Sequence, residues 1–273
     1  MKNAFIIEDL SSLNSISMNV AGPIIASYGL RSLQLPVQNF ITQTEMEGTI
    51  QSNYSSEWLK TMFETAHCQF KDAENVGLIG YLGKAEIIDL IEKSELIKDF
   101  QLLLVDPVMA DNGHYYPLLD ATYCEQLKHL LPFADVVTPN ITELACLTAT
   151  RYSTSFSEDQ VAAMTSQLRE LLKPNAVVVV TGIETQDQVG CYWDDGVSCG
   201  TNYLRKINGH FYGTGDAFAA TLLGELSNGA HLEDCLPLVM NRICQGVKNT
   251  LLDGNDLKLG VDITPLIYRN KKY

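Results

Sequence analysis

The sequence predicts one α/β domain over residues 1–273, in which helices cover both faces of a doubly wound, mostly parallel sheet. Short apolar runs rich in β-branched residues alternate with longer segments of helical periodicity, which is the pattern of a parallel sheet covered on both sides. The clearest run is 176–180, with five apolar residues of which four are valine. A chain of 273 residues can bury a core of that size, and no repeat, low-complexity segment or linker divides it.

The predicted strands are short and apolar. A helical segment separates each of the first six from the next, as the crossover connections of a parallel sheet require. These six are expected at residues 5–7, 33–37, 76–81, 102–105, 136–138 and 176–180. Two further strands, at 188–193 and 200–206, are joined through Asp194, Asp195 and Gly196, a sequence typical of a hairpin turn, and are therefore expected to be antiparallel.

The predicted helices are recognised by apolar residues three or four positions apart and by capping residues at their ends. Pro23 should either kink the first helix or mark a late start, and Gly29 should end it. Ser56 is expected to cap the second helix, and Ser157 with Gln160 to form a capping box. The helices are expected at residues 16–28, 56–66, 84–97, 123–131, 158–171 and 217–226.

The composition restricts the class of protein. The chain has 33 acidic and 19 basic residues, and its net charge of −14 disfavours binding to nucleic acid or to an anionic membrane. Its one dense basic run, at residues 269–272, is expected to be a solvated tail. Seven cysteines without a Cys-x-x-Cys pair indicate reduced thiols, and no apolar run approaches the about 18 residues of a membrane span. We therefore expect a soluble cytoplasmic protein without a signal peptide.

The segment Gly213-Thr214-Gly215-Asp216 carries the strongest chemical signal. Two glycines allow a tight turn that brings several backbone N–H groups together, and the helix after them adds the positive end of its dipole. Asp216 lies in the first turn of that helix, where its carboxylate is favoured and could accept a proton from a hydroxyl group that attacks a phosphate. The segment therefore predicts phosphoryl transfer, with a glycine turn that merely starts a core helix as the alternative.

Polar residues also follow three of the predicted strands, at the edge of the sheet where ligands collect. Asp106 follows the fourth strand, Asn140 and Glu143 follow the fifth, and Thr181 follows the sixth. Mg²⁺ prefers oxygen ligands and is usually held by one or two carboxylates together with substrate phosphate, so Asp106 and Glu143 are the predicted metal ligands. Asn140 could add an amide contact. The alternative is that Asn140 and Glu143 are the N-cap and N3 residues of a capping box.

Three segments, taken in order, resemble a known family. They are Asp-Pro-Val-Met-Ala-Asp-Asn-Gly from residue 106, Thr-Pro-Asn-Ile-Thr-Glu from residue 138, and Gly-Thr-Gly-Asp-Ala-Phe-Ala-Ala from residue 213. Together they resemble the vitamin-kinase branch of the ribokinase superfamily, most closely the pyridoxal (pyridoxamine, pyridoxine) kinases, over nearly the whole chain. The resemblance implies a ribokinase-like fold and the ATP- and Mg²⁺-dependent phosphorylation of the 5′-hydroxymethyl group of a B6 vitamer, as in vitamin B6 salvage.

The resemblance also implies roles for particular residues on the nucleotide side. Asp216 would be the catalytic base, and Gly213, Thr214 and Gly215 would form an anion hole for the transferred phosphoryl group. The ATP phosphates and the metal would lie beside a further set, namely Asn140, Thr181, Asp111, Asp106 and Glu143. Segment 206–211 and the helix after residue 236 are expected to wall the adenine pocket.

The substrate side would be formed by a second set of residues, namely Asp9, Ser11 or Ser12, Thr44, Tyr81 and Asp216. Thr44 lies in the polar, Thr-rich segment 38–48, which is either a flap over the site or a surface connection. At residues 9–12 the sequence departs from the family, because many members have Gln-Ser-His or a glycine-rich segment there. Recognition of the pyridine ring therefore stays open. The paired glycine motif and the β-lid of the sugar kinases are absent, so no separate lid domain is expected.

Two alternatives to a pyridoxal kinase remain open. A hydroxymethylpyrimidine (phosphate) kinase of thiamine biosynthesis uses the same machinery on another aromatic hydroxymethyl group. A non-catalytic relative that binds a vitamer belongs to another class of protein, and the intact Asp216, Glu143 and Asn140 argue against it. The resemblance further implies a homodimer, whereas it leaves the preferred vitamer and any requirement for a monovalent cation open. No Gly-x-Ser-x-Gly or Gly-Lys-Ser/Thr segment is present, which argues against hydrolases and P-loop enzymes.

Overall fold

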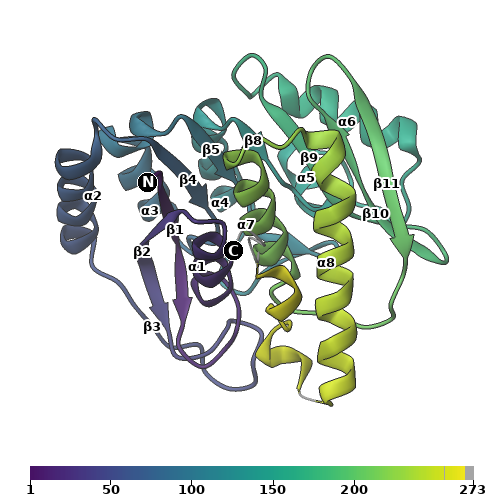
Figure 1. Ribbon diagram of the computed structural model, residues 1–273. Coiled ribbons are helices and arrows are strands. Elements are labelled where there is room, and N and C mark those ends of the chain that lie inside the picture. Colours follow the sequence, from purple (N-terminus) through teal and green to yellow (C-terminus); the bar gives the residue numbers. More distant parts are fainter. Residues whose placement is uncertain (255, 268–273) are drawn as a thin grey trace, which may run out of the picture.

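A single nine-stranded sheet organises the computed structural model, which describes residues 1–254 and 256–267 (Figure 1). Its strands are β1 Asn3–Ser11, β2 Arg31–Phe40, β3 Ser52–Asn53, β4 Asn75–Ile79, β5 Leu102–Val105, β8 Val136–Val137, β9 Val177–Glu184, β10 Gln188–Asp194 and β11 Cys199–Arg205. They lie in the order β11-β10-β9-β8-β5-β4-β1-β2-β3. The six central strands from β9 to β2 are parallel, whereas β10 and β11 at one edge and β3 at the other are antiparallel to their neighbours. The expected fold class, a mostly parallel α/β sheet, is confirmed.

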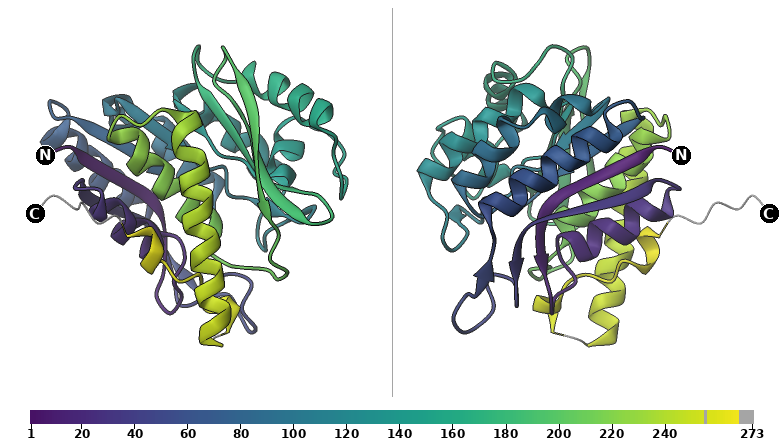
Figure 2. Two further views of the ribbon diagram at one scale, coloured as in Figure 1. Left: turned by 45° about the vertical axis from the view of Figure 1, so that its right-hand side comes forward. Right: turned by 90° about the vertical axis from the view of Figure 1, so that its left-hand side faces the viewer.

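Helices cover both faces of this sheet. They are α1 Met18–Ser27, α2 Ser56–Phe70, α3 Ala85–Glu92, α4 Ala121–Leu127, α5 Ile141–Leu147, α6 Glu158–Arg169, α7 Thr214–Ser227 and α8 Leu232–Asp253. Apolar side chains of α1, α7 and α8 form a buried cluster on one face, and those of α2 to α6 form another on the opposite face. In the right-hand view of Figure 2, β1 and β2 lie between α1 and the blue helices of the other layer.

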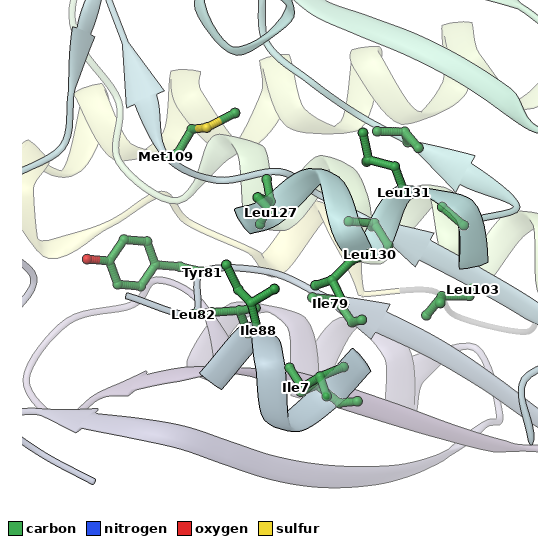
Figure 3. Close-up of a cluster of buried hydrophobic side chains, with 14 of the residues drawn as sticks. Ile7, Ile79, Tyr81, Leu82, Ile88, Leu103, Met109, Leu127, Leu130 and Leu131 are labelled. Atoms are coloured by element: carbon green, nitrogen blue, oxygen red, sulfur yellow. The ribbon is translucent and has the colours of Figure 1, made fainter. Parts of the chain in front are cut away.

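The alternation of side chains along the strands explains why both faces are apolar. In β1, Phe5 and Ile7 pack into one cluster, while Ala4 and Ile6 pack into the other. Figure 3 shows part of the cluster on the α2–α6 face, with Tyr81 at its margin and the Tyr81 hydroxyl directed away from the aliphatic side chains. A strand buried on both faces must be apolar at nearly every position, which is the pattern that the sequence predicted.

The strand order reverses at β1. From β1 the chain crosses to β2 on one side, then returns past β1 to β4 and continues outward through β5, β8 and β9. In open α/β sheets, ligands bind outside the carboxyl ends of the strands at such a reversal, because the connections leave in opposite directions and open a crevice. The fold therefore places a crevice beside the carboxyl ends of β1 and β4.

Several predicted elements differ from the observed ones in their bounds. The expected helix at 123–131 is divided into α4 and the 3₁₀ turn Lys128–Phe133, which contains Pro132. Pro132 lacks an N–H group and disfavours α conformation in the residue before it, so α4 stops early. Pro23 lies inside α1, and the N-cap of α2 is Ser55 rather than Ser56.

Other local expectations are confirmed. The capping box of Ser157 and Gln160 is present at the start of α6, and the Asp194–Gly196 turn joins β10 to β11. The small hairpin of β6 Ala110–Asp111 and β7 His114–Tyr115 was not expected. All seven cysteines are free thiols. Over residues 1–254 and 256–267, no helix has both the length and the apolar character needed to cross a membrane.

Candidate active site

A cavity of about 660 Å³ lies at the carboxyl ends of the central strands. It is lined by residues that stand at the ends of β1, β4, β5, β8 and β9, and by the first turn of α7. The structure thus brings together all but one of the residues predicted from sequence. Those that line the cavity are Asp9, Thr44, Tyr81, Asp106, Asp111, Asn140, Glu143, Thr181, Gly213, Thr214, Gly215 and Asp216.

Ser12 is the predicted residue that the structure does not bring to the cavity. Its side chain is exposed, whereas Ser11 is buried and lines the cavity. The reason is the length of β1, which the sequence predicted to end at Ile7 but which continues to Ser11. Side chains two positions apart share a face of a strand, so Ser11 lies on the side of Asp9 and donates a hydrogen bond of 3.0 Å to its Oδ2.

The turn before α7 is shaped for an anion. Gly213 adopts the left-handed conformation with φ of 79°, and a Cβ there would lie 3.0 Å from the carbonyl oxygen of Ser15. Thr214 Oγ1 donates to the Phe211 carbonyl at 3.0 Å, which fixes the turn. The N–H groups of a first helical turn have no partner within the helix, and here they open on the cavity with the positive end of the α7 dipole.

Asp216 is held in place by a contact with a residue that lies 199 positions away in the sequence. The backbone N–H of Ser17 donates to Asp216 Oδ2 at 2.7 Å. Ser17 has φ of 47° and ψ of −126°, a backbone conformation that L-residues rarely adopt. One carboxylate oxygen is therefore fixed by the N-cap of α1. Burial raises the pKa of the Asp216 carboxyl, and the Ser17 N–H group opposes that shift because it stabilises the charged form.

Asp106 and Glu143 form a buried acidic pair near the Gly213–Asp216 turn. Thr138 Oγ1 donates to Asp106 Oδ1 at 3.0 Å, and a Cβ built on Gly215 would lie 3.9 Å from Asp106 Oδ2, so this oxygen faces the anion-binding turn. Burial and the charge of Asp216 raise the pKa of Asp106 to about 8. Burial and the charge of Asp106 likewise raise the pKa of Glu143 well above its ordinary value.

The capping-box interpretation of Asn140 and Glu143 is confirmed. Asn140 Oδ1 accepts from the N–H groups of Thr142 and Glu143, and Glu143 Oε2 accepts from the Asn140 N–H at 2.8 Å. Glu143 Oε1 also accepts from the Met109 N–H at 3.0 Å, and Asn140 Nδ2 donates to the Ala110 carbonyl at 2.7 Å. The box thus joins the start of α5 to the segment after β5, and it leaves Asn140 one amide hydrogen for a ligand.

These acids fit a Mg²⁺ ion that is completed by a nucleotide. In the described part of the chain, no group of three or more His, Cys, Asp or Glu side chains could hold a metal alone. Mg²⁺ commonly binds one or two carboxylates and obtains its other ligands from phosphate and water. Asp106 and Glu143 can supply the two carboxylates. The cation would also offset the repulsion that raises their pKa values.

Thr181 and Asp111 flank the same end of the cavity. Thr181 lies within β9, which extends to Glu184, and its N–H donates to the Pro139 carbonyl at 2.9 Å. Asp111 lies on β6, where Asp111 Oδ2 is 3.7 Å from Nδ1 of His210. Burial raises the pKa of Asp111, and the Asn112 N–H group and His210 oppose the shift.

Both segments expected to wall the adenine pocket line the cavity. Segment 206–211 lines it throughout, and α8 contributes Met240, Ile243, Cys244 and Val247. Cys191 of β10 lies against Met240, with 3.5 Å between their sulfur atoms. The side of this end that α8 and Cys191 form is apolar, which suits an aromatic base.

The opposite end is formed by β1, the segment after β2 and the end of β4. The rings of Tyr81 and Phe40 lie 6.1 Å apart at 60° and form an aromatic wall. Thr44 is half-buried and lines the cavity beside Gln43, whose N–H donates to Asn14 Oδ1 at 2.9 Å. Residues 43–45 of the segment after β2 thus line the site.

Two acids of β1 complete the buried charge. Burial raises the pKa of Asp9 to about 7, a shift that the charge of Asp216 adds to and that hydrogen bonds from Ser17 and Ser11 oppose. Glu8 is 1% exposed, its Oε1 has no hydrogen-bond partner, and burial with the charge of Asp216 raises its pKa well above the ordinary value. Five carboxyl groups thus lie in one partly buried region, namely those of Glu8, Asp9, Asp106, Glu143 and Asp216.

The free energy of unfolding of the ligand-free protein is expected to fall as pH rises from about 5 to about 8. Asp9 and Asp106 have pKa values of about 7 and about 8 in the folded protein, against about 4 when unfolded. The folded state binds these protons more tightly, so the stability is fully present below the unfolded pKa and is lost as pH rises through the folded pKa. Urea unfolding at several pH values measures this slope, and a slope of the opposite sign contradicts the assigned shifts.

Three residues of the site were missed by the sequence analysis. Ser17 and Glu8 stand in no recognised motif, and Thr138 was not assigned a role within its motif; each acts through a contact with an acid far away in sequence. Thr138 opens the Thr-Pro-Asn segment, so its position directly after a strand was the one signal that could have identified it.

Comparison with known protein families agrees with this geometry. The family described as phosphomethylpyrimidine kinase matches residues 37–255 of the chain. A hydroxymethylpyrimidine/phosphomethylpyrimidine kinase of Haemophilus influenzae is 32% identical over 203 residues, which cover 71% of this chain and 70% of the relative.

Solved structures of similar proteins cover almost the whole chain. Pyridoxal kinase of Lactobacillus plantarum is 29% identical and superimposes with a TM-score of 0.90 over 98% of this chain and 95% of that one. A Bacteroides thetaiotaomicron protein, provisionally named a phosphomethylpyrimidine kinase and solved with pyridoxal, is 25% identical with a TM-score of 0.89, over 97% and 94% of the two chains. The resemblance to the vitamin-kinase branch of the ribokinase superfamily is confirmed.

Proposed function

The chain belongs to the phosphomethylpyrimidine kinase family, and we propose that within this family it phosphorylates the 5′-hydroxymethyl group of pyridoxal, pyridoxine or pyridoxamine with ATP. The observation that carries the proposal is the position of Asp216. Its carboxylate lies beside the free N–H groups of the α7 turn, in a cavity that also has an aromatic end. A base and an anion hole at one point are what phosphoryl transfer to a hydroxyl group needs.

In the proposed reaction Asp216 takes the proton of the hydroxymethyl group as its oxygen attacks the γ-phosphorus. The Ser17 N–H holds Oδ2, which leaves Oδ1 to receive the proton. The N–H groups of Gly213, Thr214 and Gly215 and the α7 dipole stabilise the charge on the transferring group. Because these donors are fixed by the fold, they need little reorganisation during the reaction.

The nucleotide would lie with its phosphates toward Asn140, Thr181 and Asp111 and its base toward α8 and segment 206–211. Asp106 and Glu143 would hold Mg²⁺, which supplies positive charge to the phosphates when bound. Without that charge, the two buried carboxyl groups would repel a nucleotide whenever they are ionised.

The vitamer ring would pack against Tyr81 and Phe40, with Asp9 and Thr44 at its polar edge. Asp9 can serve as donor or acceptor to the ring, since its pKa of about 7 allows both protonation states near neutrality. Ser11, rather than Ser12, supports the Asp9 carboxyl in this arrangement.

A hydroxymethylpyrimidine kinase is the second candidate function. It is favoured by the 32% identity to the Haemophilus influenzae enzyme, whereas the Lactobacillus plantarum pyridoxal kinase favours the vitamer. ADP release with each vitamer and with hydroxymethylpyrimidine tests the choice. We expect kcat/KM with at least one vitamer to be higher than kcat/KM with hydroxymethylpyrimidine. A clear preference for the pyrimidine would overturn the proposal.

The same assay addresses the non-catalytic alternative. Vitamer binding without ADP release would favour a binding protein. The presence of Asp106 beside Asp216 argues instead for catalytic turnover. We further propose a single cytoplasmic domain that works as a homodimer, as the family resemblance implies. Light scattering of the purified protein tests the dimer.

A further inference from the structure

Ser17 contacts two acids that have different parts in the proposed reaction. Its backbone N–H donates to Oδ2 of Asp216, the proposed base, at 2.7 Å. Its hydroxyl group donates to the carboxyl group of Asp9, at the end of the cavity where the vitamer ring would pack. Ser17 is itself 4% exposed and lines the cavity. One residue thus joins the acid that would meet the ring to the acid that would take the proton.

The Ser17 hydroxyl group does not have the role that is usual at its position. Ser17 is the N-cap of α1, where the oxygen of a serine side chain normally accepts a hydrogen bond from an N–H group of the first helical turn. In this structure the side chain makes no such capping bond. Stability of α1 therefore does not account for the hydroxyl group, and the carboxyl group of Asp9 is its partner instead.

The backbone of Ser17 is strained. Its φ of 47° and ψ of −126° lie outside the regions that residues with a Cβ atom usually occupy. Such a conformation costs free energy and persists only where the surrounding structure fixes it, as at active sites and ligand clamps. The strain directs the Ser17 N–H group at Asp216, so it coincides with a contact to the proposed base.

Contacts with two distant segments hold the residues before α1 in this shape. Asn14 is 4% exposed, and its Oδ1 accepts from the Gln43 N–H at 2.9 Å while its Nδ2 donates to the Lys258 carbonyl at 3.0 Å. The Ser15 N–H donates to the Leu259 carbonyl at 2.6 Å. The strained N-cap is therefore fixed by the fold and keeps its direction without a ligand.

We infer that Ser17 is a positioning residue of the transfer step, which sets the Asp216 carboxylate through its N–H group and ties that position to Asp9 through its hydroxyl group. This inference rests on the proposed kinase function. The proton of the alcohol goes to Oδ1 of Asp216, and no bond or proton of Ser17 changes in the step. Because Ser17 acts on the placement of the base, its loss should lower kcat and leave nucleotide binding nearly unchanged.

The test removes the hydroxyl group of Ser17 and keeps the N–H group. ADP release is measured with whichever vitamer or pyrimidine the unchanged protein uses best. Ser17→Ala should lower kcat at least about 10-fold, which is the typical worth of a hydrogen bond to a charged group. Its KM for MgATP should stay within about 2-fold. Ser17→Gly removes the same hydroxyl group and adopts the observed backbone freely, so it should lose kcat to the same extent even if the alanine variant folds poorly.

Ser15→Ala is the matched control. It makes the same change two residues earlier, at an exposed side chain that does not line the cavity, and it keeps the backbone contact with Leu259. Its kcat should stay within about 2-fold of that of the unchanged protein. A loss of kcat in Ser15→Ala as large as that in Ser17→Ala would assign the effect to the loop as a whole and overturn the inference.

A double-mutant cycle with Asp9→Ala separates positioning from a merely structural role. If the hydroxyl group acts through Asp9, Ser17→Ala should lower kcat by less than about 2-fold in the Asp9→Ala background. Equal losses in both backgrounds, or a normal kcat in Ser17→Ala and Ser17→Gly, would overturn the inference. A preference of the unchanged protein for hydroxymethylpyrimidine over every vitamer would overturn the proposed function alone, because the cycle is measured with the alcohol that is used best.

Discussion

Replacing Asp216 by Asn is expected to lower kcat by at least about 10²-fold, since general-base catalysis is typically worth that much. Asparagine keeps the shape of the side chain and an oxygen that can accept from the Ser17 N–H at the position of Oδ2. The fold and the KM for ATP should therefore change little. Steady-state ADP release measures kcat, and circular dichroism checks the fold.

Asp234→Asn is the matched control, because Asp234 also lies in the first turn of a helix but is exposed and outside the cavity. It should retain full turnover. If the Asp216 variant kept near-normal kcat, Asp216 would not be the base. If it lost turnover together with its fold, the Asp216→Glu variant, which keeps the charge but moves the carboxylate, would separate position from charge.

Replacing Asp106 by Asn is expected to raise the Mg²⁺ concentration for half-maximal activity by at least about 10-fold. Mutation of residues that only support metal ligands typically lowers metal affinity by about 10- to 100-fold. Loss of a ligand itself should lower the affinity by at least as much. The same variant should weaken the fall of stability between pH 5 and about 8, since it removes the buried carboxyl whose pKa is about 8. A Mg²⁺ titration of ADP release measures the first effect.

Asp253→Asn removes one charge from an exposed position of α8 and serves as the control. Its Mg²⁺ dependence should match that of the unchanged protein. An unchanged Mg²⁺ requirement in the Asp106 variant would remove Asp106 from the metal site and leave Glu143 as the remaining candidate.

The sequence predicted the sheet and most of the site because both depend on local signals. Apolar runs gave the strands, and glycine, asparagine and acidic residues at strand ends gave the positions around Asp216, Asn140 and Asp106. Glu143 illustrates a limit of prediction from sequence. The same Asn-x-x-Glu spacing predicts both a capping box and a site residue, so the sequence could not decide between them. The structure shows that both its oxygens accept backbone N–H groups inside the cavity lining.

What sequence could not supply were contacts between distant segments and the true ends of strands. Ser17 holds Asp216 across 199 residues through a backbone N–H in an unusual conformation, which leaves no pattern in side-chain types. The choice between Ser11 and Ser12 depends on β1 continuing to Ser11, and polar residues at 8, 9 and 11 hide that continuation. The two-residue strands β3, β6 and β7 are too short to produce any periodicity.

The most direct test of the proposed function is a competition in one tube between pyridoxal and hydroxymethylpyrimidine at equal concentration with MgATP. The ratio of the two phosphorylated products, measured by mass spectrometry, equals the ratio of the kcat/KM values. We predict that pyridoxal phosphate exceeds the pyrimidine phosphate by at least about 10-fold, as about 1.4 kcal/mol of preferred transition-state binding would give. An excess of the pyrimidine phosphate would contradict the assignment.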